Sequence, residues 1–212
     1  KIAGALLLNI GTLNEVEVEA MIEAGKAANS AGVPVIVDPV GAGATAYRTN
    51  TVKEIMSAVK VDLLRGNGGE IAALLGESGS TKGVDGTTNV PRPSLAKQSA
   101  GAFSTIVAIT GETDIVTDGK TAFEIGNGHS WMTKVVGTGC LLGAVLGAYM
   151  AVSENKVEAI GEGLAYYGLA GELAYEKTKH LGIGSYQVAF LDQLHVLTSE
   201  TFEARKQIKP LT

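Results

Sequence analysis

The stretch VPVIVDP, residues 33–39, is an apolar run that ends in a carboxylate and a proline. A run of this kind indicates a strand buried on both faces, because a strand with one wet face alternates apolar and polar residues. A helical pattern precedes it, with Asn14 placed to cap the helix and Gly32 to end it. A second helical pattern, marked by Val52 and Ile55, follows it. The stretch therefore predicts a buried strand between two helices.

The same alternation extends over the first half of the chain. We expect strands at residues 3–10, 33–37, 61–67 and 105–110, and helices at 14–32, 52–59, 70–75 and 93–103. Buried strands that alternate with helices predict an α/β fold, in which helices cover both faces of a mostly parallel sheet. Neither a repeat nor a linker interrupts residues 1–212, so we expect one domain.

The remaining segments carry other signals. Residues 114–125 alternate around Asp118-Gly119, which predicts a hairpin. A polar, glycine-rich loop is expected at residues 76–89. After Gly139 the pattern predicts helices up to the C-terminus, with breaks near Ser153 and Gly182.

Composition excludes several classes of protein. The chain has 212 residues, 45% of them hydrophobic, and a formal net charge of −5, so it offers no basic stripe for nucleic acid. Its longest apolar run, residues 139–152, is shorter than the roughly 20 residues that a membrane-spanning helix needs. Cys140 is the only cysteine, which excludes an intrachain disulfide and fits a cytoplasmic protein. Lys1 is followed at once by a strand-like run without a signal-peptide pattern.

Polar or glycine residues follow each predicted strand. In an open parallel sheet, ligands bind beyond the carboxyl ends of the strands. Those ends, together with the glycine turn before the longest apolar run, supply the candidates Asn9, Asp38, Arg65, Thr110 and Gly137. We therefore expect a ligand site at this edge of the sheet.

Gly137, Thr138, Gly139 and Cys140 form a glycine-rich turn before the long apolar helix. Such a turn lets backbone approach a ligand closely, and the first amides of a helix attract anions. The turn therefore indicates a site for a phosphoryl group or an oxyanion, although a turn that only packs a helix on a sheet has the same sequence pattern. Thiolates form more readily at a helix N-terminus, so Cys140 is a candidate proton acceptor. A small buried side chain is the alternative.

Two carboxylates are candidates for a metal site. Asp38 ends a strand and Glu70 opens a helix, and their hard oxygen atoms suit Mg²⁺. Water and phosphate would complete the coordination shell. The alternatives are an Asp-Pro pair that opens a turn and a glutamate that complements a helix dipole.

Arg65 and Thr110 are candidates for phosphate binding. The planar guanidinium of arginine binds phosphate oxygens through two N–H groups, and Thr110 would add a hydroxyl at the end of the neighbouring strand. A surface salt bridge for Arg65 and an ordinary strand exit for Thr110 are the alternatives.

The sequence contains no convincing match to a known phosphate-binding motif. The P-loop pattern is absent, whereas residues 41–46, GAGATA, match the dinucleotide fingerprint G-x-G-x-x-A. However, Asp38 and Pro39 separate the strand from the first glycine, and no acidic residue follows at a strand end about 20 positions on. The match is therefore weak.

Seven motifs extend over nearly the whole chain: LLLNIGTL, VIVDPVGAGATAYR, LLRGNGGEIAAL, KGVD, AITGETDIV, NGH and VVGTGCLLGAVLGA. In these motifs the sequence resembles the hydroxyethylthiazole kinase family of the ribokinase-like superfamily, which acts in thiamine biosynthesis and salvage. The resemblance implies a three-layer α/β/α kinase that uses ATP and Mg²⁺ to phosphorylate the primary alcohol of 4-methyl-5-(2-hydroxyethyl)thiazole. It also implies a cytoplasmic homotrimer with sites between subunits.

The resemblance also implies roles for single residues. Arg65 and Thr110 would bind ATP, and Gly137 would contact the thiazole. Asp38 and Glu70 would lie beside the metal.

Cys140 stands where most ribokinase-like enzymes carry the aspartate that faces the substrate hydroxyl. It would therefore act as a modest catalytic base, beside the backbone of Thr138 and Gly139. The family also has an N-terminal stretch ahead of LLLNIGTL, and this sequence starts after it, so we expect the domain to lack that segment.

Three rival functions remain open. A hydroxymethylpyrimidine kinase shares the superfamily. A non-catalytic thiazole or nucleotide sensor would explain Cys140 as the loss of an aspartate. A dinucleotide-dependent oxidoreductase would use residues 41–46.

Overall fold

The computed structural model describes residues 2–76 and 90–211. Most of the predicted loop at 76–89, and with it the KGVD motif, therefore lies outside the described residues. In chain order the elements are β1 (Leu6–Asn9), α1 (Glu15–Ser30), β2 (Val35–Asp38), α2 (Ala46–Ala58), β3 (Leu63–Asn67), α3 (Gly68–Leu75), α4 (Arg92–Phe103), β4 (Ile106–Thr110), β5 (Asp114–Thr117), β6 (Ala122–Ile125), the 3₁₀ helix η2 (Ser130–Lys134), α5 (Thr138–Val152), α6 (Lys156–Thr178), α7 (Ile183–Val196), α8 (Ser199–Arg205) and β7 (Ile208–Pro210).

The strands form one sheet in the order β1-β2-β3-β4-β5-β6-β7. Strands β1 to β4 pair in parallel, and β5, β6 and β7 each run antiparallel to the preceding strand. The register places Asn9 beside Asp38 and Asn67 beside Thr110. The predicted α/β fold is confirmed, and the carboxyl ends of its parallel strands meet at one edge.

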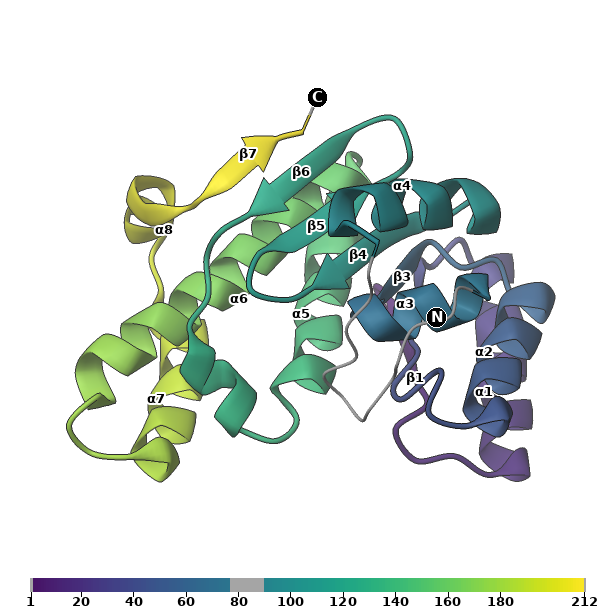
Figure 1. The fold of residues 1–212 in the computed structure, drawn as a ribbon, viewed down its shortest axis with the longest axis horizontal. Helices are drawn as coiled ribbons and strands as arrows, with labels where there is room; N and C mark the ends of the chain where they lie inside the picture. The colour runs from purple at the N-terminus through teal and green to yellow at the C-terminus, as the bar shows by residue number, and fades with distance from the viewer. Residues whose placement is uncertain (1, 77–89, 212) are drawn as a thin grey trace.

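Helices cover both faces of this sheet (Figure 1). Val37 and Leu64 belong to a core that includes side chains of α1, α2, α3 and α4. Ile36 and Leu63, their neighbours in sequence, belong to a second core with side chains of α5, α6, α7 and α8. This alternation produces the predicted α/β/α layers. Within the described ranges, no helix combines the length and the apolar character that a membrane crossing needs.

Hydrogen-bonding caps set where the first helices begin. The Asn14 side chain accepts the Glu17 N–H at 3.0 Å, as predicted for the start of α1, and Gly32, with φ +69°, follows that helix. Helix α2 begins at Ala46, well before the predicted residue 52, because the Thr45 side chain caps it. The spacing of apolar residues predicted only the part of α2 that is buried.

The expectation of helices up to the C-terminus is wrong. Strand β7 pairs with β6, and the Leu211 N–H donates to the Ala122 carbonyl at 2.8 Å. Only Ile208 of β7 is partly buried, whereas Lys209 and Pro210 are exposed. Backbone hydrogen bonds therefore hold this edge strand, and the apolar pattern contains no trace of it.

Candidate active site

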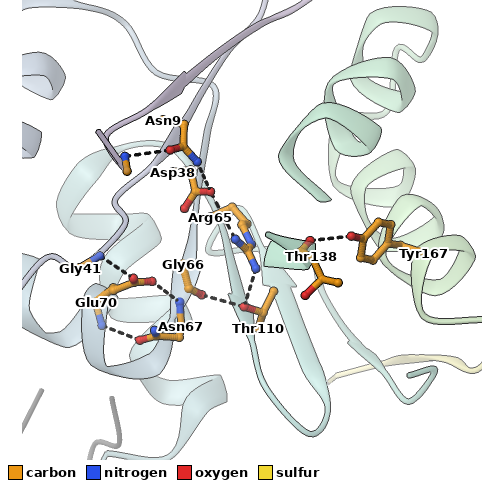
Figure 2. A network of polar contacts seen from close by, with 11 residues as sticks. Asn9, Asp38, Gly41, Arg65, Gly66, Asn67, Glu70, Thr110, Thr138 and Tyr167 are labelled. Atoms are coloured by element: carbon orange, nitrogen blue, oxygen red, sulfur yellow. Dashed lines mark hydrogen bonds and ion pairs between the residues drawn. The ribbon is translucent and has the colours of Figure 1, made fainter. Parts of the chain in front are cut away.

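A chain of polar contacts crosses the carboxyl ends of β1 to β4 (Figure 2). Asn9 Nδ2 donates to Asp38 Oδ2 at 2.8 Å, and Arg65 Nη1 lies 3.5 Å from the same oxygen. Arg65 Nη2 donates to Thr110 Oγ1 at 3.1 Å. The sheet therefore brings Asp38, Arg65 and Thr110 together, as their places at strand ends predicted.

Arg65 lies at the centre of this chain. It is only 8% exposed, which excludes the alternative of a surface salt bridge. Its Nε atom is buried and has no hydrogen-bond partner among the described residues. A Cβ built on Gly139 would lie 3.5 Å from both Nη1 and Nη2, so the guanidinium faces the first turn of α5. Its unused donor capacity suits an anion with several oxygens.

The two candidate metal ligands are bonded differently. Asp38 is buried, and desolvation raises the pKa of its carboxyl, while the Arg65 guanidinium partly offsets this effect. The oxygens of Glu70 accept main-chain N–H groups at 2.8 Å, one from Gly41 and one from Asn67. Burial also raises the pKa of Glu70, against the opposing effect of these bonds. Glu70 therefore joins the β2–α2 loop to the start of α3.

The donor set nevertheless fits Mg²⁺. No hydrogen bond from the described residues reaches Asp38 Oδ1, and each oxygen of Glu70 has a further lone pair. A cation beside Asp38 would stabilise its buried charge. Within residues 2–76 and 90–211, no group of three or more Asp, Glu, His or Cys side chains is placed to hold a metal. Water and substrate oxygens would therefore have to complete the coordination.

Backbone groups form the turn that precedes α5. Gly137 has φ +91°, a conformation that favours glycine, and α5 has no side-chain cap. The first helical hydrogen bond runs from the Leu141 N–H to the Gly137 carbonyl at 2.9 Å. The amides of residues 138–140 precede that bond and have no acceptor within the helix. These three amides are the groups that would bind the anion predicted from the sequence.

The side chains of this turn differ in direction. Thr138 Oγ1 donates to the carbonyls of Met132 and Val135, at 3.0 and 3.1 Å. Its hydroxyl therefore holds η2 rather than a ligand, and only the amide of Thr138 serves the candidate site. Cys140 is exposed, so the alternative of a small buried side chain is wrong.

Residues 41–46 form a closed loop and not an open phosphate cradle. The amides of Gly41, Ala42 and Gly43 each donate to an acceptor inside the protein, at 2.8 Å in every case. A dinucleotide fingerprint needs such amides for the pyrophosphate. The loop geometry therefore speaks against the oxidoreductase alternative.

Two residues that support the site were not among the candidates from the sequence. Arg48 Nη1 donates to the carbonyls of Ile10 and Val40, at 2.9 and 2.8 Å, and so joins the loops after β1 and β2. Tyr167 OH donates to the Thr138 carbonyl at 2.5 Å. Both residues lie in helices, and the apolar pattern of a helix predicts only which of its side chains are buried. It does not predict which main-chain carbonyls a side chain contacts.

Comparisons with known proteins give one consistent result. A family model described as HK: Hydroxyethylthiazole kinase family matches residues 1–200. The hydroxyethylthiazole kinase of Shouchella clausii (strain KSM-K16) is 52% identical over 211 residues, which cover 99% of this chain and 81% of that protein. A solved structure of a hydroxyethylthiazole kinase protein from Pyrococcus horikoshii OT3 is 37% identical, with a TM-score of 0.87, over 100% of this chain and 78% of that one.

A more distant structure supports the fold alone. A ribokinase-like superfamily protein from Enterococcus faecalis V583 has 11% identity and a TM-score of 0.63, over 88% of this chain and 62% of that one. The family match and the close relative, added to the geometry above, lead to one conclusion. The chain belongs to the hydroxyethylthiazole kinase family.

Proposed function

We propose that this chain is an ATP-dependent kinase that phosphorylates the primary hydroxyl of 4-methyl-5-(2-hydroxyethyl)thiazole in thiamine biosynthesis or salvage. One observation carries the proposal: the buried guanidinium of Arg65 lies between the Asp38 carboxylate and the unpaired amides at the start of α5. A guanidinium and free amides that converge suit a triphosphate. The names of the relatives from S. clausii and P. horikoshii support the thiazole alcohol as acceptor.

The site would act mainly by positioning and by neutralising charge. In phosphoryl transfer, negative charge is spread over the equatorial oxygens of the migrating group. The Arg65 guanidinium and the amides of Thr138, Gly139 and Cys140 face the same space and would contact these oxygens. Arg65 and Thr110 would also hold the other phosphates of ATP. Electrostatic stabilisation is effective when such donors are in place before the reaction.

Asp38 and Glu70 would hold Mg²⁺. When bound there, the ion would neutralise phosphate charge and help to align the two oxygens between which the phosphoryl group moves. Glu70 is already bonded through both oxygens. Asp38 therefore has the greater capacity for direct coordination, and Glu70 would act through a water molecule.

Cys140, as the thiolate, would accept the proton of the alcohol and become the thiol as the new O–P bond forms and the bond to ADP breaks. Its exposure at the first turn of α5 leaves the thiol accessible to a substrate. Gly137, one turn earlier and also exposed, would contact the thiazole ring. A thiol is a poor ligand for a hard cation, so Cys140 would not bind the magnesium.

We extend the proposal to a single-domain, cytoplasmic homotrimer with sites between subunits, as the family resemblance implies. The exposed side chain of Val136, beside the site, supports an interface there. Val136 is 99% exposed next to Gly137, and water is an unfavourable neighbour for an apolar side chain of this size. A substrate or a neighbouring subunit would cover it.

A coupled ADP-release assay with MgATP tests the function. We expect ADP release to depend on the thiazole alcohol, with mass spectrometry locating the phosphate on its hydroxyl. The kcat/KM for the thiazole should exceed that for hydroxymethylpyrimidine by at least about tenfold, a ratio within the range that one pocket provides.

Other outcomes would contradict the proposal in distinct ways. Turnover of the pyrimidine alone would identify a hydroxymethylpyrimidine kinase. Tight binding of ATP and thiazole without turnover would identify a sensor. Tight binding of NAD would favour an oxidoreductase.

A further inference from the structure

Tyr167 connects the middle of α6 to the first turn of α5. Its hydroxyl donates to the carbonyl of Thr138 at 2.5 Å (Figure 2). The residue is only 3% exposed, and its ring meets Phe190 of α7 edge-on, with 4.9 Å between ring centroids. A buried hydroxyl held in this way has few other conformations, so the bond has a fixed direction.

Thr138 is held from two sides. Its hydroxyl bonds to the carbonyls of Met132 and Val135, and its own carbonyl accepts the bond from Tyr167. Gly137, the residue before it, contributes no side-chain cap to α5. These hydrogen bonds of Thr138 therefore help to fix the start of α5.

Helix α6 is itself closely seated where Tyr167 lies. A Cβ on the next residue, Gly168, would come within 2.4 Å of the Asn127 carbonyl, so only glycine permits this approach. Asn127 in turn bonds to Glu172, one helical turn further along α6, at 3.0 Å. The Tyr167 hydroxyl is therefore attached to a helix that has little freedom to slide.

The Arg65 guanidinium, which faces the first turn of α5, indicates that this turn binds a ligand. Arg65 is 8% exposed, its Nε has no partner among the described residues, and both Nη atoms face Gly139. The distance between this guanidinium and the amides of residues 138–140 determines whether both can contact one phosphoryl group. That distance depends on where α5 begins.

We propose that Tyr167 is a positioning residue for phosphoryl transfer: through the Thr138 carbonyl it holds the first amides of α5 in register with the Arg65 guanidinium. This inference rests on the proposed kinase function. It concerns groups that contact the transition state, so loss of the hydroxyl should lower kcat more than it weakens ATP binding.

Tyr167→Phe tests the proposal, because it removes the hydroxyl and keeps the ring against Phe190. The chain offers a matched control in the preceding residue. Tyr166 OH donates to the Leu194 carbonyl at 2.8 Å, on the side of α7, so Tyr166→Phe removes an equivalent bond that does not reach α5. Calorimetry with ATP counts the competent sites of each variant, and kcat is then expressed per site.

For Tyr167→Phe we expect an unchanged number of ATP sites, a dissociation constant within about twofold of the wild-type value, and a kcat per site about tenfold lower, which corresponds to about 1.4 kcal/mol in the barrier. Tyr166→Phe should keep the wild-type kcat per site. A purely structural role for Tyr167 would instead reduce the number of competent sites and leave the kcat per site unchanged, which would overturn the proposal.

Amide hydrogen exchange provides a second, independent readout. Tyr167→Phe should speed exchange at residues 141 and 142, the first amides bonded within α5, relative to both the wild type and Tyr166→Phe; equal exchange in all three proteins would overturn the proposal. If the wild type released no ADP with any alcohol, the kinase function itself would fail. An active wild type with indistinguishable Tyr167→Phe and Tyr166→Phe variants would reject the positioning role alone.

Discussion

Cys140 lies in the first turn of α5 with its side chain exposed. The proposed mechanism gives this residue a modest share of the rate, because phosphoryl transfer depends mainly on positioning and on charge neutralisation. We expect Cys140→Asp, which places a carboxylate base at the same point, to keep or raise kcat in the ADP-release assay. Cys140→Ser, which keeps the size but lacks a ready proton acceptor, should be slower than the wild type. A folded but inactive Cys140→Asp variant would contradict the assignment of a base here.

Asp114 begins β5 beside the site, and its Oδ1 accepts the Gly111 N–H at 2.9 Å. Burial raises the pKa of Asp114 to about 6, against the opposing effects of that bond and of Arg65 and Arg92. The native state therefore holds this proton more tightly than the unfolded chain does. It follows that the contribution of Asp114 to the free energy of unfolding falls as pH rises from about 4 to about 6.

Asp114→Asn should remove this loss while it keeps an oxygen acceptor for the Gly111 amide. Urea unfolding gives the free energy of unfolding of the variant minus that of the wild type. This difference should be about 1 to 3 kcal/mol more favourable to the variant at pH 7 than at pH 4. Asp192→Asn, at an exposed position on α7, serves as the control. Parallel pH curves for the wild type and Asp114→Asn would show that burial of this carboxyl costs nothing.

At the residue scale, the sequence indicated which side chains come together, but not what holds them. Asp38, Arg65 and Thr110 were predictable because a parallel sheet collects its strand ends at one edge, and the structure places them in contact. Arg48 and Tyr167 were not, because both act on main-chain carbonyls. Which carbonyls lie within reach depends on packing that no local pattern encodes.

Among the elements, helix α5 carries the candidate site because Gly139 has no side chain where its first turn faces Arg65. A Cβ on Gly139 would make only ordinary contact with the guanidinium, at 3.5 Å from each terminal nitrogen. The branches of a valine would extend further and fill the space between the guanidinium and the amides of residues 138–140. The small size of this residue thus matters for binding more than for folding.

Gly139→Val should therefore fold and lose most activity. We expect a melting temperature within a few degrees of the wild-type value and a kcat/KM at least about 100-fold lower, the size of effect seen when one donor to a transition state is lost. Ala148→Val, at an exposed position of the same helix, controls for the cost of a β-branched residue. A fully active Gly139→Val enzyme would show that no ligand enters this space.

Element boundaries were less predictable than element types. Helix α1 begins where its cap predicted, because the Asn14 side chain accepts the Glu17 N–H. Helix α2 begins earlier than its apolar spacing indicated, because its first residues face water and a Thr45 cap fixes them. Strand β7 escaped detection because the backbone of β6, and not an apolar face, holds it.

At the scale of the whole molecule, Asn127 joins three parts of the chain. Its Nδ2 donates to Glu172 Oε1 of α6 at 3.0 Å and to the Arg205 carbonyl of α8 at 3.2 Å, while its Oδ1 accepts the Gln207 N–H at 2.7 Å. The residue is 4% exposed. It therefore attaches the last helix and strand to the layer that also positions Tyr167.

Asn127→Ala should lower the free energy of unfolding by about 3 kcal/mol, because it leaves several buried polar groups without partners. Urea unfolding measures the change, and Asn50→Ala, on the exposed face of α2, is the control. Amide hydrogen exchange in this variant should speed up more in β7 and α8 than in β2 or β3. A loss below about 0.5 kcal/mol, the usual effect of a surface substitution, would show that the C-terminal segment is held by other contacts.

The fold class followed from the sequence because a sheet covered on both faces needs unbroken apolar strands, and the apolar run at residues 33–37 contains most of β2, Val35–Asp38. The position of α5 over the sheet did not follow. A Cβ on Gly143 would lie 2.9 Å from the tip of Leu7, and a Cβ on Gly147 would lie 3.3 Å from the side chain of Ala5. These close approaches set the depth at which α5 meets the sheet, and only the assembled molecule defines them.

In the proposed mechanism, the amides at the start of α5 and the Arg65 guanidinium together bind the migrating phosphoryl group. The most direct test is a crystal structure of the protein with a non-hydrolysable ATP analogue, magnesium and the thiazole alcohol. We expect γ-phosphate oxygens within about 3 Å of the amides of residues 138–140 and of Arg65, with the metal beside Asp38. A triphosphate bound away from the start of α5 would contradict it.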